Sequence, residues 1–350
     1  MAAATPSPIQ IGQFDYPECF SAFLRGDANG QKHKTQHVIE ALVKELRKED
    51  VVFGDNKPVD VLDVGCGPGI YAKKFLDSVG KSFPGKINYH GVDIDAGFVS
   101  AAAQTVSGLP NVNEAKTRIA NAFEGDSLTS GKVGLAQASH MVYHAADGSK
   151  SQQETEQKID RFTTSIMNSV ADNGIAIFFH GGKDSDMHGK IARNFGPLMC
   201  DAPDRIAAAA KKAGKEIVEL PVESKLYFPD LNPAAYEKLK DVNNYKNFAP
   251  DSDELRWLKL LTFALHTDLK NLADKEKLGE CIDFTRKLLD DNRDRKGGFL
   301  MVRGTMQVVM NDAGMKPKIE RAVAAVKNQM PEIDRKTESD MVKENSAIRM

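Results

Sequence analysis

The feature that most constrains the fold of this chain is a glycine-rich turn directly after a short apolar run. The run covers residues 59–64, and the turn reads Gly65-Cys-Gly67-Pro-Gly69. A short apolar run bounded by turn residues is typical of a buried strand, and glycines let the backbone approach a ligand at the carboxyl end of such a strand. We therefore expect a strand, a tight turn and a helix, with a ligand on the turn. A plain strand-to-helix turn is the alternative.

The chain beyond this turn alternates between strand-like and helical patterns. Strands are expected at residues 87–92, 114–119, 133–139 and 174–179, and helices at 71–79, 96–106 and 152–170. Alternation of this kind implies right-handed crossovers and a parallel sheet that helices cover on both faces. The predicted fold class is therefore α/β, with a doubly wound, mainly parallel sheet.

Composition and charge exclude several classes of function. The 350 residues carry a net charge of -2, so electrostatics gives no reason to expect nucleic acid or an anionic membrane as partner. No apolar run is long enough to cross a bilayer, and the N-terminus lacks the pattern of a signal peptide. The four cysteines lie far apart without metal spacing, which is typical of reduced thiols in a cytoplasmic protein. The sequence leaves the oligomeric state open.

The acidic residues near the turn favour a cationic ligand over a dinucleotide. A dinucleotide-binding turn would place its third glycine at Ile70, and Asp63 would face a pyrophosphate unfavourably. S-adenosylmethionine has no phosphate and carries an ammonium and a sulfonium, so a carboxylate suits it. Asp93 closes the next predicted strand, at about the distance where a carboxylate meets ribose hydroxyls. For Asp93 and for Asp95, N-capping of the next helix is the alternative.

These residues resemble the class I, Rossmann-like S-adenosylmethionine-dependent methyltransferases. That family shows Asp-x-Gly-x-Gly-x-Gly, an acidic residue at the end of the second strand, and a segment after the fourth strand shaped like residues 138–144 here. The resemblance implies S-adenosyl-L-methionine as cofactor, methyl transfer to a small molecule, and a seven-stranded sheet with a helical lid. The cofactor-binding residues that it implies are Asp63, Gly65, Gly67, Gly69, Asp93, Asp95, Ala138 and Ser139.

A narrower resemblance covers residues 14–312, which are similar to the histamine N-methyltransferase group. The opening Tyr16-Pro-Glu-Cys-Phe20-Ser-Ala-Phe23-Leu matches that family's Tyr-x-x-x-Phe-x-x-Phe-Leu, and the block around Trp257 follows in the family's order. The resemblance implies that these N-terminal aromatic residues wall the acceptor pocket. Without it, their i, i+4, i+7 spacing equally predicts a helix that packs an apolar stripe on the core.

The other residues expected to bind the acceptor are Tyr143, Trp257 and Arg303. Two polar contacts of the resembling family fall on Asn29 and Gly304 here, and Arg303 beside Gly304 could hold a carboxylate. We therefore expect methylation of a nitrogen on an amine or amino-acid-like acceptor, in place of histamine. O- or S-methylation of a small acid or phenol is the alternative. A regulatory module that binds the cofactor without catalysis is the third.

The chemistry places few demands on the protein. Methyl transfer from a sulfonium is an in-line displacement, so the protein mainly aligns the nucleophile and excludes water. An amine must be neutral when it attacks, and a histidine at a strand end could take its proton; the candidates are His140, His144 and His180. Each alone is more often structural. The aspartates and histidine of residues 184–188 suggest a cation, but their spacing fails the calcium-loop pattern, and we expect no metal.

Helical patterns dominate the second half of the chain, apart from strands expected at 216–223 and 299–309. A helical insertion between two late strands is expected to cover the open end of the sheet. The expected parts are an N-terminal lid segment (1–34), a cofactor-binding core (35–232), a helical insertion over the acceptor site (233–295), a last core strand (296–312) and a charged C-terminal appendage (313–350).

Overall fold

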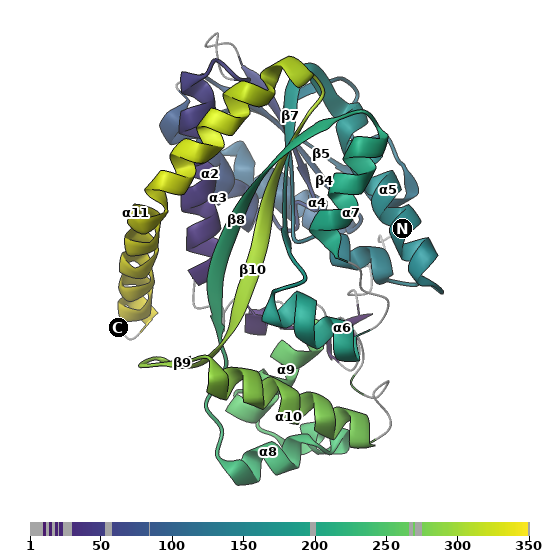
Figure 1. The fold of residues 1–350 in the computed structure, drawn as a ribbon, viewed down its shortest axis with the longest axis vertical. Helices are drawn as coiled ribbons and strands as arrows, with labels where there is room; N and C mark the ends of the chain where they lie inside the picture. The colour runs from purple at the N-terminus through teal and green to yellow at the C-terminus, as the bar shows by residue number, and fades with distance from the viewer. Residues whose placement is uncertain are drawn as a thin grey trace.

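A twisted sheet of seven long strands forms the core of the computed structural model (Figure 1). The structure describes residues 10–11, 14–15, 18–19, 21–23, 30–52, 58–83, 85–196, 201–265, 269 and 275–348. The strands are β3 (Val59–Val64), β4 (Ile87–Asp93), β5 (Val112–Ile119), β6 (Val133–Ser139), β7 (Val170–Gly181), β8 (Glu216–Tyr227) and β10 (Gly297–Met310). The short β1 (Gln10–Ile11) and β2 (Phe14–Asp15) form a separate pair, and β9 (Arg293–Asp294) pairs with the start of β10.

The strand order is β5-β4-β3-β6-β7-β10-β8, which confirms the predicted doubly wound sheet. The pairs from β5 to β7 are parallel, whereas β10 is antiparallel to both β7 and β8. The order reverses direction between β3 and β6. Ligands bind at such a switch point in open α/β sheets, outside the carboxyl ends of the strands.

Helices cover both faces of this sheet, and the alternation of side chains along each strand explains why. In β7, Ile177 and Phe179 belong to the cluster under one layer, whereas Ala176 and Phe178 belong to the cluster under the other. The first layer holds α2 (Gly30–Lys48), α3 (Ile70–Ser82), α4 (Ala96–Ser107) and α11 (Lys316–Ile348). The second holds α5 (Gln152–Ser169) and α7 (Ala202–Lys212), with η1 (Ala122–Glu124) and η2 (Val142–Ala146) beside them.

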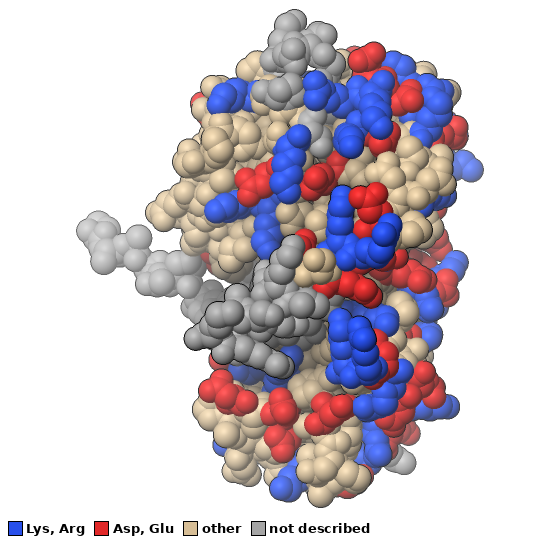
Figure 2. Space-filling model, turned by 90° about the vertical axis from the view of Figure 1, so that its left-hand side faces the viewer, with Lys and Arg blue, Asp and Glu red and all other residues tan. Residues whose placement is uncertain are grey.

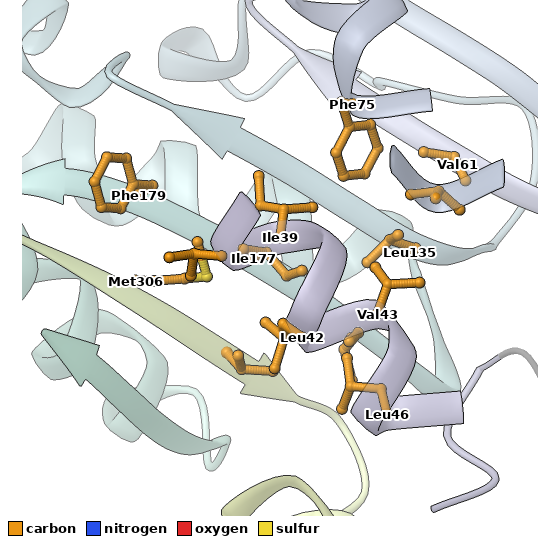
Figure 3. Packing of buried hydrophobic residues seen from close by; sticks show 14 of the residues in the cluster. Ile39, Leu42, Val43, Leu46, Val61, Phe75, Leu135, Ile177, Phe179 and Met306 are labelled. Carbon is orange, nitrogen blue, oxygen red and sulfur yellow. The ribbon is translucent and has the colours of Figure 1, made fainter. Parts of the chain in front are cut away.

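The helix α2 packs one continuous apolar stripe against the sheet (Figure 3). The stripe consists of Ile39, Leu42, Val43 and Leu46, and its partners in the cluster include Val61, Phe75, Leu135, Ile177, Phe179 and Met306. The spacing of three and four residues places the stripe on one side of the helix. This packing holds α2 between α3 and α11, and Thr35, Gln36 and Ile39 of its N-terminal half line the cavity at the carboxyl edge of the sheet.

The C-terminal segment is part of this core, in place of the expected appendage. The helix α11 buries Ile319, Val323 and Val326 in the same cluster and lies along α2 (Figure 1). Lys34 of α2 and Asp334 of α11 form an ion pair with an N–O distance of 2.6 Å. This burial could not be predicted from the sequence, because the apolar stripe of the helix is narrow and charged residues surround it.

The helices α8 (Pro233–Leu239), α9 (Asp253–Leu265) and α10 (Lys275–Asp291) lie between β8 and β10 in the chain and extend from one end of the sheet (Figure 1). A π-helix, η3 (Asp186–Ile191), and α6 (Ala192–Phe195) follow β7 and contact α9. Basic and acidic side chains intermix over the face shown in Figure 2, so no large patch of one sign covers that face. None of the helices in the described part of the chain has the length and apolarity that a membrane span needs.

Candidate functional site

A cavity of about 640 Å³ follows the carboxyl edge of the sheet. Its lining comes, in strand order, from residues that follow β5, β4, β3 and β6, and then from η3 beyond β7. The N-terminal half of α2 and Phe263 of α9 complete its walls. The volume lies within the range of small-molecule sites. Three large apolar side chains on its wall are notably exposed: Ile70 (50%), Tyr71 (37%) and Ile94 (57%). Exposed apolar side chains gathered on one concave wall mark a binding surface.

The glycine turn borders this cavity through its backbone. Gly65, Gly67 and Gly69 have φ angles of 74°, 51° and 84°, in the left-handed region that favours glycine. A Cβ atom built on Gly67 would meet nothing within 4 Å, so the turn leaves open space there. The backbone at Gly67 is therefore accessible to a ligand in the cavity.

Three residues expected to bind the cofactor lie outside the cavity lining. A Cβ atom on Gly69 would lie 2.8 Å from the Cα atom of Ala102, so this glycine allows α4 to pack against the turn. The Asp95 side chain caps α4, because it accepts a 2.9 Å hydrogen bond from the Phe98 amide. Ala138 is fully buried within β6, and Ser139 after it lines the cavity. The N-capping alternative thus describes Asp95.

Asp93 lines the cavity and also holds the turn in place. One of its carboxylate oxygens accepts a 2.9 Å hydrogen bond from the Gly67 amide, and the other accepts one of 3.1 Å from the Asp95 amide. Burial raises the pKa of Asp93. The Ile94 amide is a third backbone donor to this carboxylate, and three donors leave one of its four lone pairs for a ligand hydroxyl.

Asp63 is the most deeply placed acid of the cavity wall. Its two oxygens accept hydrogen bonds from the Tyr89 hydroxyl at 2.9 Å and from the Gln137 amide nitrogen at 2.6 Å. Burial nevertheless raises the pKa of Asp63 to about 6, because desolvation outweighs the two donors. The carboxyl group is therefore expected to take up a proton in mildly acidic solution.

This raised pKa predicts a pH-dependent difference between the wild type and Asp63→Asn. The folded protein holds the Asp63 proton up to about pH 6, whereas the unfolded chain loses it near 3.8. The contribution of Asp63 is therefore fully present below pH 4 and declines as the pH rises through 6. We expect the free energy of unfolding of the variant, relative to wild type, to rise by about 2–3 kcal/mol between pH 4 and pH 7. Denaturant titrations of both proteins without ligand measure this difference. If their free energies of unfolding change with pH in parallel, the prediction is wrong.

The far end of the cavity, beyond β5, contains residues that the sequence did not single out. Ala120, Asn121 and Phe123 line it there, and Phe123 stacks on Phe162 with ring centroids 4.8 Å apart. The Asn121 side chain caps η1 by accepting a 3.0 Å hydrogen bond from the Phe123 amide. The sequence could have indicated Asn121 by its position. It directly follows the third predicted strand, and the end of that strand must lie beside the end of the second.

The opposite end is walled by aromatic rings. Phe23 stacks on Phe263 with centroids 4.7 Å apart, and Tyr143 lies 6.4 Å from Phe263. The Tyr143 ring is nearly parallel to the His188 ring, at 5.8 Å and 5°. Phe23 and Tyr143, both expected to bind the acceptor, line the cavity. Tyr16, Phe20 and Asn29 lie outside the residues that the structure describes.

Two residues expected to bind the acceptor are placed elsewhere. Trp257 is fully buried among the helices of the insertion, where its ring meets Phe228 and Tyr236 edge to face. The Arg303 side chain lies outside the cavity lining and donates a 2.9 Å hydrogen bond to Glu223 on the neighbouring strand β8. Sequence order identifies the element that carries each residue, but it does not identify the face to which the side chain points.

The predicted histidines fall into three environments. His140, in a left-handed conformation with φ of 57°, lines the cavity, and burial lowers its pKa to about 4. His144 also lines the cavity and lies 3.0 Å from an Asp147 oxygen through its Nδ1 atom. His180 is buried outside the large cavity and borders a separate pocket of about 20 Å³. Burial also lowers the pKa of His180.

In the acidic segment 184–188, Asp186 has a structural role. The buried Asp186 carboxylate accepts hydrogen bonds from Lys190 at 2.7 Å, from Asn292 at 2.8 Å and from the Met301 amide at 2.7 Å. These bonds attach η3 to β10. Within the described ranges, no group of three or more histidine, cysteine or acidic side chains is arranged to hold a metal ion. His188 of this segment lines both pockets. The sequence placed the whole segment 180–188 at the acceptor pocket but named His188 itself only as a possible metal ligand.

No protein-family model and no curated protein matches this chain. Among solved structures, it is similar to loganic acid methyltransferase with SAH, at 10% identity and a TM-score of 0.51 over 87% of this chain and 99% of that one. It also matches the [4+2]-cyclase SpnF, at 16% identity and a TM-score of 0.38 over 77% of this chain and 80% of that one. The first likeness shows that the chain has the Rossmann-like fold of a methyltransferase.

Proposed function

We propose that this protein transfers a methyl group from S-adenosylmethionine to a small molecule, onto a nitrogen of an amine or amino-acid-like acceptor. The observation that carries the proposal is the continuous cavity, which has the glycine turn and Asp93 towards one end and an aromatic wall at the other. Such a cavity can hold a cofactor and an acceptor end to end. The similar loganic acid methyltransferase was solved with SAH, which supports this choice of cofactor.

The residues present suit this cofactor. The Gly65 and Gly67 backbone can approach its polar tail, and the Asp93 carboxylate can accept hydrogen bonds from its ribose. Ile94, Phe98 and Phe123 offer apolar surface for its base. When bound, the cofactor supplies a methyl group already activated by the sulfonium, so the protein's task is alignment and exclusion of water.

The aromatic wall supports a nitrogen acceptor. Rings such as Phe23, Tyr143 and Phe263 stabilise a nearby cation, and both a sulfonium and a methylated amine carry positive charge. Phe23, which the narrower resemblance to the histamine N-methyltransferase group assigns to the acceptor pocket, is one of these rings. A second candidate, O-methylation of a small acid, is favoured by the likeness to a methyltransferase of loganic acid.

The cofactor assignment predicts a ligand-specific shift in melting temperature. S-adenosylmethionine and S-adenosylhomocysteine should each stabilise the native protein by about 2.7 kcal/mol at a concentration one hundred times their Kd. NAD should leave the melting temperature unchanged, because Ile70 and Asp63 do not suit a pyrophosphate. A shift with NAD and none with S-adenosylmethionine would refute the proposal.

The reaction itself is tested with radiolabelled S-adenosylmethionine and a panel of amines, amino acids, phenols and small acids. Transfer to an amine or amino acid is the expected result, and transfer only to acids would establish the second candidate. A protein that binds the cofactor tightly but transfers no methyl group to any member of the panel would instead be a regulatory binding module.

A further inference from the structure

We propose that His188 binds the acceptor's nitrogen and takes its proton, which makes it a catalytic residue of this site. The inference rests on the proposed function. His188 lines the large cavity beside Met187, Tyr143 and Phe263, at the end away from β5. It therefore lies at the aromatic end, where the acceptor is placed.

The position of the His188 ring is strongly constrained. A Cβ atom on Gly181 would lie 2.4 Å from the His188 Cδ2 atom, so the ring packs directly on a glycine backbone. Tyr143 lies parallel to the ring, and Asp186 attaches the π-helix to β10. π-Helical turns are rare and frequently occur at functional sites. A ring fixed by these contacts is well suited to set the direction of an acceptor's hydrogen bond.

The other histidines are less suited to this role. His180 does not line the large cavity, and His140, whose buried ring has a strongly lowered pKa, is a weak base. His144 lies beside Asp147, and both border the cavity together with Lys158 of α5, the helix that packs on η1. The His144 ring also meets the Tyr143 ring, with centroids 4.6 Å apart, so His144 is the nearest competitor, but its Nδ1 atom is already engaged by Asp147.

In the proposed step, His188 accepts a proton from the acceptor's ammonium group. The nitrogen lone pair then forms a bond to the methyl carbon, while the carbon–sulfur bond breaks and its electron pair remains on sulfur. His188 also borders the pocket of about 20 Å³, which has room for about one water molecule. The buried Nε2 atom of His180 has no hydrogen-bond partner in the described structure. A water molecule in this pocket, which both rings border, can relay the proton away from His188.

The test compares His188→Gln with wild type, using the amine or amino acid that gives the highest kcat/KM in the panel. Glutamine keeps a polar side chain of similar size but cannot take a proton at neutral pH. We expect kcat/KM at pH 7 to fall by about 10²–10⁴-fold, with S-adenosylhomocysteine affinity and melting temperature nearly unchanged. The loss should shrink as the pH approaches the pKa of the acceptor amine, because the free amine then needs no base.

His90→Gln is the matched control, since His90 lies on β4 outside the cavity lining and contacts Asp60. It should keep both the rate and the pH profile of wild type. A folded His188→Gln protein with wild-type kcat/KM, or with a loss that is the same at every pH, would overturn the assignment of His188 alone. A wild-type protein that methylates no acceptor would overturn the proposed function, and this inference with it.

Discussion

Replacing Gly67 by valine should abolish S-adenosylmethionine binding and leave a folded protein. The Cβ atom of the variant would point into open cavity space, so its two methyl groups would occupy volume that the ligand needs. At a φ angle of 51°, any side chain also costs about 1–2 kcal/mol of backbone strain. The turn can lower this strain only by changing its conformation, which would move the backbone that contacts the ligand. We expect the affinity measured by calorimetry to fall by at least about 100-fold.

Gly108→Val supplies the matched control for this change. Gly108 also has open space around its Cβ position, but it lies at the end of α4, outside the cavity lining. Its replacement should leave the affinity for S-adenosylmethionine within about twofold of wild type. A folded Gly67→Val protein that binds S-adenosylmethionine as tightly as the Gly108→Val protein would show that the ligand does not sit on the turn.

Val326→Asp should destabilise the whole protein by more than about 4 kcal/mol. Val326 is fully buried where α11 packs on the core, so the variant would bury a carboxylate without a partner. The neighbouring Lys327 is exposed, and Lys327→Asp should change the free energy of unfolding by no more than about 0.5 kcal/mol. Both values come from denaturant titrations. Equal stabilities for the two variants would mean that α11 is indeed an appendage.

The central fold could be predicted because local signals and the global arrangement agree. The glycine turn identified the first strand and the helix after it, and alternating apolar patterns predicted the remaining strands of the sheet. The expectation for α11 was wrong because its burial depends on a partner, α2, that lies about 300 residues earlier in the chain. A narrow apolar stripe among charged residues does not by itself distinguish a docked helix from a solvated one.

The candidate site was predictable where the backbone determines it and less so where side-chain direction does. Gly67 and Asp93 follow directly from the strand-turn-helix pattern, and both border the cavity. Trp257 and Arg303 lie on a helix and a strand that the sequence predicted, but neither side chain points into the cavity. His188 was considered only as a possible metal ligand, because the direction of its side chain depends on a π-helix that has no sequence signature.

The ion pairs between α2 and α11 have a thermodynamic consequence. Thr35 and Gln36 border the cavity, and the residues on either side of them, Lys34 and His37, bind Asp334 and Asp340 of α11. We therefore expect docking of the C-terminal helix and occupancy of the cavity to be coupled equilibria. By linkage, whatever favours the docked helix tightens ligand binding, and a bound ligand in turn holds the helix in place by the same free energy.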